Sequence, residues 1–296
     1  MNGFASDWNS FLGPVKEAFP GARILVARAN EGATRHGVVE GGERLAAEIL
    51  DACKSLDGLH SFVIVGHSLG GLYARYACGL LYSNPLTAPG APGSVLHWVS
   101  YMSLASPHLG SLRPTGSVAK SLWRRAVHGV LYGFYGRTGA DLMLAPRTPA
   151  AAGAGADVGT PVLLRMCEGD FIAALRAFEH RTLVAMTDHD MSVPFAGASI
   201  RADDPHGAAP KPPLFGWRSK PTSWHVATLE GWPAEAPARH LLPHVREPSG
   251  ARATRARSSD TAGSSSKLVT DARREVEFSP AVFEALSGLQ WRRVDI

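Results

Sequence analysis

Short apolar runs alternate with amphipathic segments along much of this chain. Four runs combine β-branched, aromatic and aliphatic residues and are typical of buried strands; they cover residues 22–27, 61–65, 95–104 and 182–186. Helices are predicted between them over residues 43–50, where apolar positions lie four apart, and over residues 71–82. Apolar strands separated by helices predict an α/β fold, in which a mostly parallel sheet is covered by helices on both faces.

Two compositionally biased segments interrupt this alternation. Residues 146–160 are rich in Ala, Gly and Pro and are interpreted as a loop or insertion. Residues 248–268 are rich in Ser, Arg, Ala and Gly, which predicts a disordered linker. The chain therefore divides into a domain of residues 1–247, this linker, and residues 269–296, which we expect to complete the same domain.

The sequence Gly66-His67-Ser68-Leu69-Gly70 lies where the second predicted strand meets the second predicted helix. A G-x-S-x-G sequence in this context is typical of a nucleophile elbow, a strained turn that presents the serine hydroxyl above the edge of the sheet. Side chains at Gly66 and Gly70 are expected to collide with the neighbouring strand and helix. The N–H of Leu69, at the helix N-terminus, is expected to stabilise an oxyanion. The alternative is a purely structural glycine-rich turn.

Composition limits the functional classes. The net charge is only +4, and the densest basic cluster, residues 252–257, lies in the predicted linker, so we expect no nucleic-acid partner. No apolar run is long enough to predict a transmembrane helix, and the N-terminus lacks the pattern of a secretory signal. The cysteines Cys53, Cys78 and Cys167 form neither a metal-ligand spacing nor a disulfide framework, so we expect no metal site and a reducing, cytoplasmic location.

Several further blocks occur in the order that is found in one known family. They are Gly3–Trp8, residues 34–38 and 41–46, the elbow of residues 65–77, Leu104–Gly110, residues 163–166 and 173–178, His189–Pro194 and Leu289–Asp295. Together they resemble the eukaryotic putative serine esterase family, a lipase-like branch of the α/β-hydrolase fold. The resemblance implies serine-dependent hydrolysis of a lipid or another small-molecule acyl ester, with no cofactor. A lipid substrate would bring transient contact with a membrane surface, and nothing in the sequence indicates a protein partner.

The resemblance also bears on an apolar and aromatic segment at residues 117–135. In a lipase-like protein, residues 111–180 would form a cap over the active site. The alternative is that the apolar segment is an ordinary core helix.

A serine nucleophile needs a histidine that accepts its proton and an acid that orients the histidine. In this fold the three occur along the chain in the order Ser, Asp or Glu, His. Ser68 is therefore the expected nucleophile. Asp190 is the expected acid, because it follows the fourth predicted strand and matches the acidic loop of the family; Asp188 is the alternative. Three adjacent residues rarely converge on one ion, so we expect no metal at Asp188-His189-Asp190.

The histidine base is not assigned from the sequence. Four histidines follow the predicted acid: His206, His225, His240 and His244. Each is interpreted as a surface or loop residue unless the structure brings it to the site. His67 and His108 match family blocks but precede the acid in the chain, so they are interpreted as structural or supporting residues.

The resemblance places the missing groups at the two ends of the chain. The family's catalytic histidine follows the Leu289–Asp295 block, beyond Ile296, and its strand ending in His-Gly, which supplies a second oxyanion N–H, precedes Met1. We therefore expect truncation at both ends. This expectation leaves a second hypothesis, a catalytically incomplete α/β-hydrolase fragment with a binding role only. Acyl transfer instead of hydrolysis is a further alternative.

Overall fold

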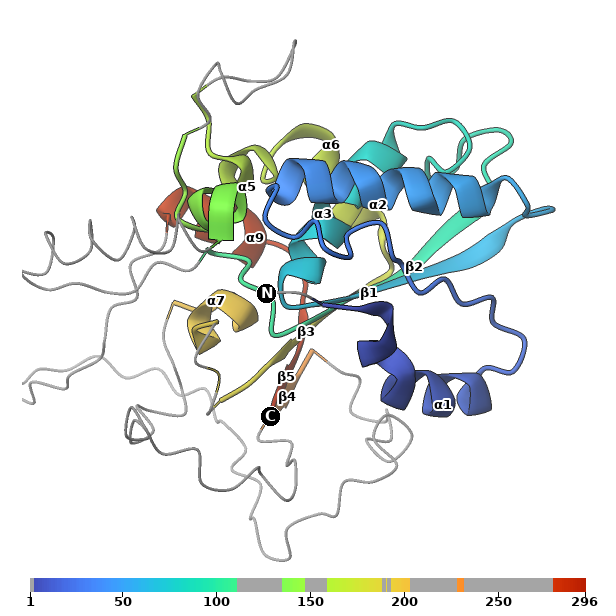
Figure 1. The fold of residues 1–296 in the computed structure, drawn as a ribbon, viewed down its shortest axis with the longest axis horizontal. Coiled ribbons are helices and arrows are strands. Elements are labelled where there is room, and N and C mark those ends of the chain that lie inside the picture. The colour runs from blue at the N-terminus through green and yellow to red at the C-terminus, as the bar shows by residue number, and fades with distance from the viewer. Residues whose placement is uncertain are drawn as a thin grey trace, which may run out of the picture.

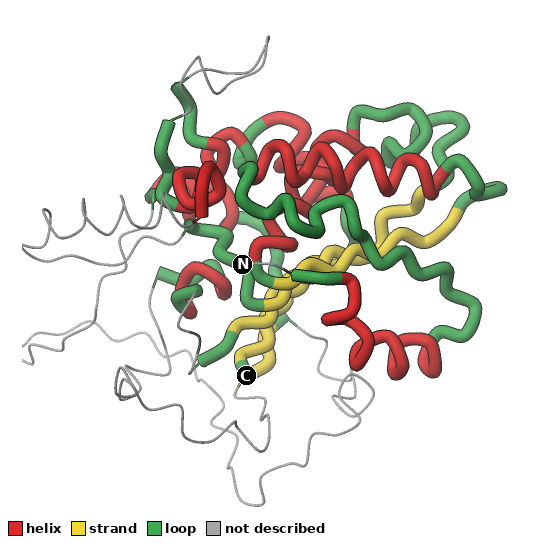
Figure 2. The backbone as a smooth tube through the Cα atoms, viewed as in Figure 1, coloured by secondary structure: helices red, strands yellow, loops and turns green. Residues whose placement is uncertain are grey.

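A five-stranded sheet forms the centre of the protein in the computed structural model (Figures 1 and 2). The structure describes residues 3–110, 135–146, 159–187, 190, 193–202, 228–231 and 279–296. The strands are β1 (His60–His67), β2 (Leu96–Leu104), β3 (His180–Ala185), β4 (Thr228–Glu230) and β5 (Arg292–Asp295). Their order is β1-β2-β3-β5-β4, with only β4 antiparallel to its neighbour. The predicted α/β fold with a mostly parallel sheet is confirmed.

Helices lie on both sides of this sheet. They are η1 (Ala5–Trp8), α1 (Asn9–Ala18), α2 (Val38–Cys53), α3 (Leu69–Tyr82), α5 (Val162–Arg165), α6 (Gly169–Ala177), α7 (Phe195–Ser199) and α9 (Pro280–Ser287). Figure 1 shows α2, α3 and α6 together on one side of the strands and α1 on the other. The helices predicted over residues 43–50 and 71–82 lie within α2 and α3 and are confirmed.

Helix α3 is buried along most of its length because α2, α6 and the sheet pack against it. Two glycines of α2 allow this close packing. A Cβ atom on Gly41 would lie 2.2 Å from the ring of Tyr73, and one on Gly42 would lie 2.5 Å from Tyr76. The mostly apolar sequence of α3 agrees with this burial, although Leu80 is exposed.

An aromatic cluster fills the space beneath α3 and α6. The rings of Trp98 and Phe178 lie 4.8 Å apart, and Phe62 and Tyr101 pack against them. The indole N–H of Trp98 donates a 2.8 Å hydrogen bond to the carbonyl of Thr87. Each fully buried aromatic side chain contributes about 2–3 kcal/mol through the area it removes from water. This cluster fixes β1 and β2, the strands that lead to the predicted site.

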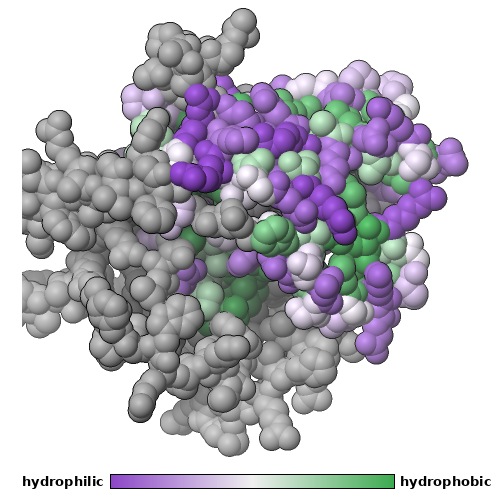
Figure 3. All heavy atoms as spheres, in the orientation of Figure 1, coloured by the Kyte–Doolittle hydropathy of each residue, from purple (hydrophilic) through white to green (hydrophobic). Residues whose placement is uncertain are grey.

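The strand predicted over residues 22–27 is wrong. The segment is a loop that pairs with no strand of the described chain, and Ile24 and Leu25 are exposed. The backbone N–H groups that follow it, at Arg28 and Ala29, bond to the carboxylate of Glu48 instead. Figure 3 shows a hydrophobic area on this face, in the region where Figure 1 draws the connection between α1 and α2. A β-like composition does not by itself supply a pairing partner.

Among the described residues, no helix has the length and hydropathy required to cross a membrane.

Candidate active site

Ser68 lies between the last residue of β1 and the first residue of α3, as the motif predicted. Its backbone has φ 52° and ψ −126°, a conformation that costs a non-glycine residue about 1–3 kcal/mol. The Ser68 N–H donates a 2.8 Å hydrogen bond to the carbonyl of Leu104 at the end of β2. Leu69 is the first residue of α3, so its N–H is among the amides that have no acceptor within the helix. The strained strand–turn–helix geometry is therefore present.

The glycines of the motif have unequal roles. A Cβ atom on Gly66 would lie 2.6 Å from the backbone of Gly71, so the expected collision at this position is confirmed. At Gly70 the expectation is wrong, because no atom lies within 4 Å of an added Cβ. The second tight position is Gly71 instead, where a Cβ would lie 2.0 Å from Oγ of Ser106. Strand β1 and helix α3 therefore touch through Gly66 and Gly71.

The turn after β2 supports the elbow. Tyr101, on β2, donates a 2.8 Å hydrogen bond from its hydroxyl to the carbonyl of Gly71, in the first turn of α3. Ala105 adopts φ 47°, and its N–H bonds to the carbonyl of Val184 on β3 at 2.8 Å. No sequence pattern predicts this contact, because Tyr101 lies 30 residues after Gly71 in the chain.

Asp190 follows β3 by five residues and is half-buried. Its Oδ1 accepts a 2.9 Å hydrogen bond from the N–H of Val193 in the same loop. Because β1, β2 and β3 are parallel, Ser68 and Asp190 both follow the carboxyl ends of strands, at one edge of the sheet. Asp188, the alternative acid, lies outside the described residues. The assignment of Asp190 as the acid remains a prediction.

The four candidate bases, His206, His225, His240 and His244, also lie outside the described residues. So do residues 111–134 and 147–158 of the predicted cap and the predicted linker at 248–268. The described end of β5 lies next to the segment that follows β3. The N–H of Ile296 bonds to the carbonyl of Ala185, and its own carbonyl accepts the N–H of Thr187 at 2.7 Å. Ile296 is thus beside the segment that leads to Asp190.

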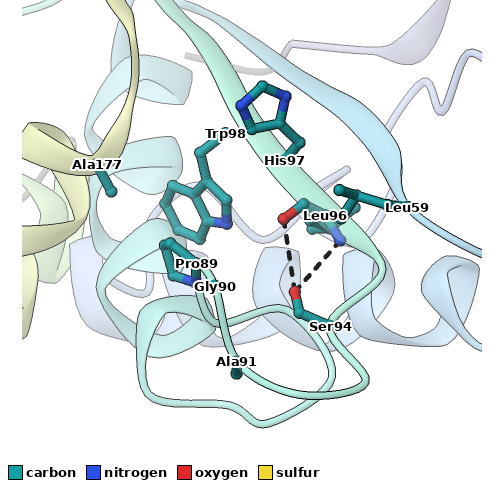
Figure 4. Close-up of a pocket in the computed structure, with 9 residues that line it drawn as sticks. All are labelled: Leu59, Pro89, Gly90, Ala91, Ser94, Leu96, His97, Trp98 and Ala177. Atoms are coloured by element: carbon teal, nitrogen blue, oxygen red, sulfur yellow. Dashed lines mark hydrogen bonds between the residues drawn. The ribbon is translucent and has the colours of Figure 1, made fainter.

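A cavity of about 310 Å³ lies at the opposite end of the sheet. Figure 4 shows Trp98, Leu96 and Leu59 around it, with Ser94 hydrogen-bonded to the backbone of Leu96. These residues lie at the amino ends of β1 and β2, whereas Ser68 follows the carboxyl end of β1. This cavity is therefore separate from the candidate active site.

A buried polar network lies beneath α3. His108 Nε2 is 2.7 Å from Oγ of Ser103, and His108 Nδ1 is 3.5 Å from a guanidinium nitrogen of Arg75. His108 and Arg75 are both buried, at 0% and 1% exposure. Burial, together with the charge of Arg75, lowers the pKa of His108 well below its usual value, so the ring is neutral. Arg75 can donate only to Nδ1, and Ser103 can accept from Nε2, so these two neighbours favour the neutral tautomer in which Nε2 carries the proton.

Comparison with known proteins identifies a family and two relatives of this chain. The family model described as "Putative serine esterase (DUF676)" matches residues 2–200. "Putative lipase C4A8.10" of Schizosaccharomyces pombe is 32% identical over 174 residues, which cover 56% of this chain and 20% of that protein. "Putative lipase ROG1" of Saccharomyces cerevisiae is 29% identical over 195 residues, which cover 63% and 24%.

The chain therefore aligns with about a fifth to a quarter of the length of these two curated relatives. The family match extends from the N-terminal block through the elbow and the Asp190 loop to the end of α7. The strained serine turn and the parallel sheet on which it lies agree with that match. The chain belongs to the putative serine esterase family.

Proposed function

We propose that this protein is a serine-dependent carboxylic ester hydrolase and that Ser68 is its nucleophile. The observation that carries the proposal is the strained backbone of Ser68 at the junction of β1 and α3. A strained backbone conformation persists only where the surrounding structure fixes it, and such conformations are concentrated at functional sites. Here the Gly66–Gly71 contact and the hydrogen bond to Leu104 fix it.

In the proposed reaction, Ser68 Oγ attacks the acyl carbon of the ester while a histidine accepts its proton. The carbonyl oxygen becomes an oxyanion, to which the Leu69 N–H and the N-terminus of α3 donate. Collapse of this intermediate releases the alcohol, which takes the proton back from the histidine. Water then attacks the acyl-enzyme in the same way and releases the carboxylic acid. Asp190 orients the histidine and stabilises its charged form.

The proposed substrates are neutral acyl esters, with lipids as the favoured class. Both yeast relatives carry the name lipase, and the family is described as a serine esterase. The elbow itself does not select a head group or chain length, because it contacts only the reacting atoms. Short-chain aryl esters are therefore suitable first substrates, since they need little beyond the nucleophile and the oxyanion donors.

A fluorophosphonate probe tests the proposal directly. The wild-type chain should be labelled covalently, peptide mapping should place the adduct on Ser68, and Ser68→Ala should abolish labelling. Ser61→Ala is the matched control, because Ser61 is an exposed serine on β1, the strand that leads to Ser68. Hydrolysis of a short-chain p-nitrophenyl ester should fall by at least about 10³-fold in Ser68→Ala alone.

Two results contradict the proposal. Labelling that persists in Ser68→Ala assigns the nucleophile elsewhere. A folded wild-type chain that neither reacts with the probe nor hydrolyses the ester favours the second hypothesis, a protein with a binding role only.

A further inference from the structure

His108 contacts three separate parts of the candidate active site. Its ring lies against Arg75 of α3 and bonds to Ser103 of β2. Its backbone N–H is shared between the carbonyl of Ser106, at 2.9 Å, and the carbonyl of Gly197, at 3.1 Å, in α7, the helix that follows the Asp190 loop. One residue therefore joins the helix of the predicted nucleophile to the helix beside the predicted acid.

Arg75 makes the contact with His108 costly to lose. Within the described part of the chain it forms no ion pair, so carbonyl and imidazole groups surround its buried charge. Its guanidinium lies 3.5 Å from the carbonyl of His108 and donates to the carbonyl of Met166 at 3.3 Å. The Nε atom of Arg75 already has no hydrogen-bond partner among the described residues, so losing a further partner of this buried cation is costly and favours a shift of the helix.

The neighbouring contacts transmit such a shift to Ser68. Arg75 lies seven residues, or about two turns, after Ser68 on α3. The first turn of this helix rests on Ser106 through Gly71, and Ser106 lies two residues before His108. The turn of residues 105–110 is thus packed against the nucleophile helix on one side and hydrogen-bonded to α7 on the other.

We propose that His108 is a positioning residue that sets α3 against α7 and, through them, Ser68 against the Asp190 loop. It touches no substrate. Its effect on the reaction rests on the proposed function, whereas its effect on the two helices does not. The proposal also explains why a histidine occupies a fully buried turn: one side chain must accept from Arg75 and donate to Ser103 at the same time.

Two substitutions at His108 separate positioning from packing. His108→Leu fills the space but makes neither hydrogen bond, whereas His108→Gln keeps one donor and one acceptor. His97→Gln is the matched control, because His97 lies at the amino end of β2 with a half-exposed side chain paired to Glu179. Ser103→Ala is a milder variant that removes only the Ser103 hydroxyl and serves if His108→Leu fails to fold.

Hydrogen exchange measured by mass spectrometry provides a readout that needs no activity. In folded His108→Leu, the peptides that cover residues 66–72 and 193–199 should both exchange faster, while those of β1 and α2 should not. The rate of fluorophosphonate labelling and kcat for ester hydrolysis should fall about 10- to 100-fold with KM unchanged. His108→Gln should recover most of this loss, and Ser103→Ala should lose about 2- to 10-fold.

The possible outcomes are distinct. Wild-type exchange at both segments in folded His108→Leu, or in Ser103→Ala if only that variant folds, overturns the positioning role. Faster exchange at both segments supports positioning even if the wild-type chain is not labelled, and in that case the proposed function fails by itself. Faster exchange with labelling at the wild-type rate restricts His108 to a structural role and overturns its proposed effect on Ser68.

Discussion

The two halves of the candidate site are held in different ways. Ser68 is fixed by a hydrogen bond to Leu104, a distant residue of β2, and by the close contact between Gly66 and Gly71 on either side of it. Asp190 lies in a loop after β3 and accepts a hydrogen bond from Val193, only three residues away. A nucleophile must be presented in one strained conformation, whereas an acid in a loop can be held by local hydrogen bonds. The comparison predicts that changes in the packing around the elbow act through stability and that changes at Asp190 act through rate.

The largest effect should follow from Asp190→Asn. If Asp190 orients the base, kcat for ester hydrolysis should fall by about 10⁴-fold, because the amide no longer holds the histidine in the correct tautomer. The free energy of unfolding should change by only about 1 kcal/mol, since the hydrogen bond from Val193 can persist. Asp188→Asn is the control and should reduce kcat less than tenfold. The reverse pattern would assign the acid to Asp188.

At the elbow, Gly66→Ala should destabilise the protein by at least about 3 kcal/mol. The added methyl group meets the backbone of Gly71 at 2.6 Å, and a backbone cannot move aside as a flexible side chain can. Gly70→Ala, four positions along the same motif, should be neutral or stabilising by up to about 1 kcal/mol, because the position is open and helical. Urea unfolding of both variants measures the difference. Equal losses would contradict the packing of β1 on α3.

These two glycines also show which features of the fold can be predicted from the sequence and which cannot. The pattern of apolar runs predicted β1, β2, β3, α2 and α3 because burial imposes a regular spacing. The motif predicted the turn at Ser68. It could not predict that Gly71, and not Gly70, is the position without room for a Cβ atom, because the order of residues does not show which atoms lie nearby. The strand prediction for residues 22–27 was wrong for a related reason, because pairing in a sheet depends on a neighbouring strand that local composition does not specify.

The pH dependence of stability should depend on His108. Arg75 faces the ring from α3, and Tyr101 lies beside it on β2. Burial and Arg75 lower the pKa of His108 in the folded state, so below about pH 6.5 the unfolded chain binds a proton that the folded chain does not. Stability is therefore retained above that pH and lost as the pH falls. Between pH 7 and 5.5 the wild type should lose about 1 kcal/mol more than His108→Gln in urea unfolding. Parallel losses would mean that the folded protein charges His108 without penalty.

A smaller effect is expected from Tyr101→Phe, which tests the support of the elbow from β2. The variant keeps the buried ring and loses only the hydroxyl that donates to Gly71. The carbonyl of Gly71 is then left without this donor, so the free energy of unfolding should fall by about 1–2 kcal/mol. Thermal unfolding measures the loss, and the labelling rate of Ser68 should fall with it. Unchanged stability would show that the carbonyl finds another donor.

The smallest effect is expected away from the site, at Leu25. Leu25→Ser should change the free energy of unfolding by less than about 0.5 kcal/mol, because the side chain is exposed and its segment pairs with no described strand. Ile64→Val on β1 is the comparison and should cost about 1 kcal/mol, since Ile64 is buried in the core beneath α3. Urea unfolding of the two variants decides whether burial or local hydrophobicity governs stability here. If Leu25→Ser costs as much as Ile64→Val, residues 22–27 are packed in solution, and the strand predicted from their sequence regains support.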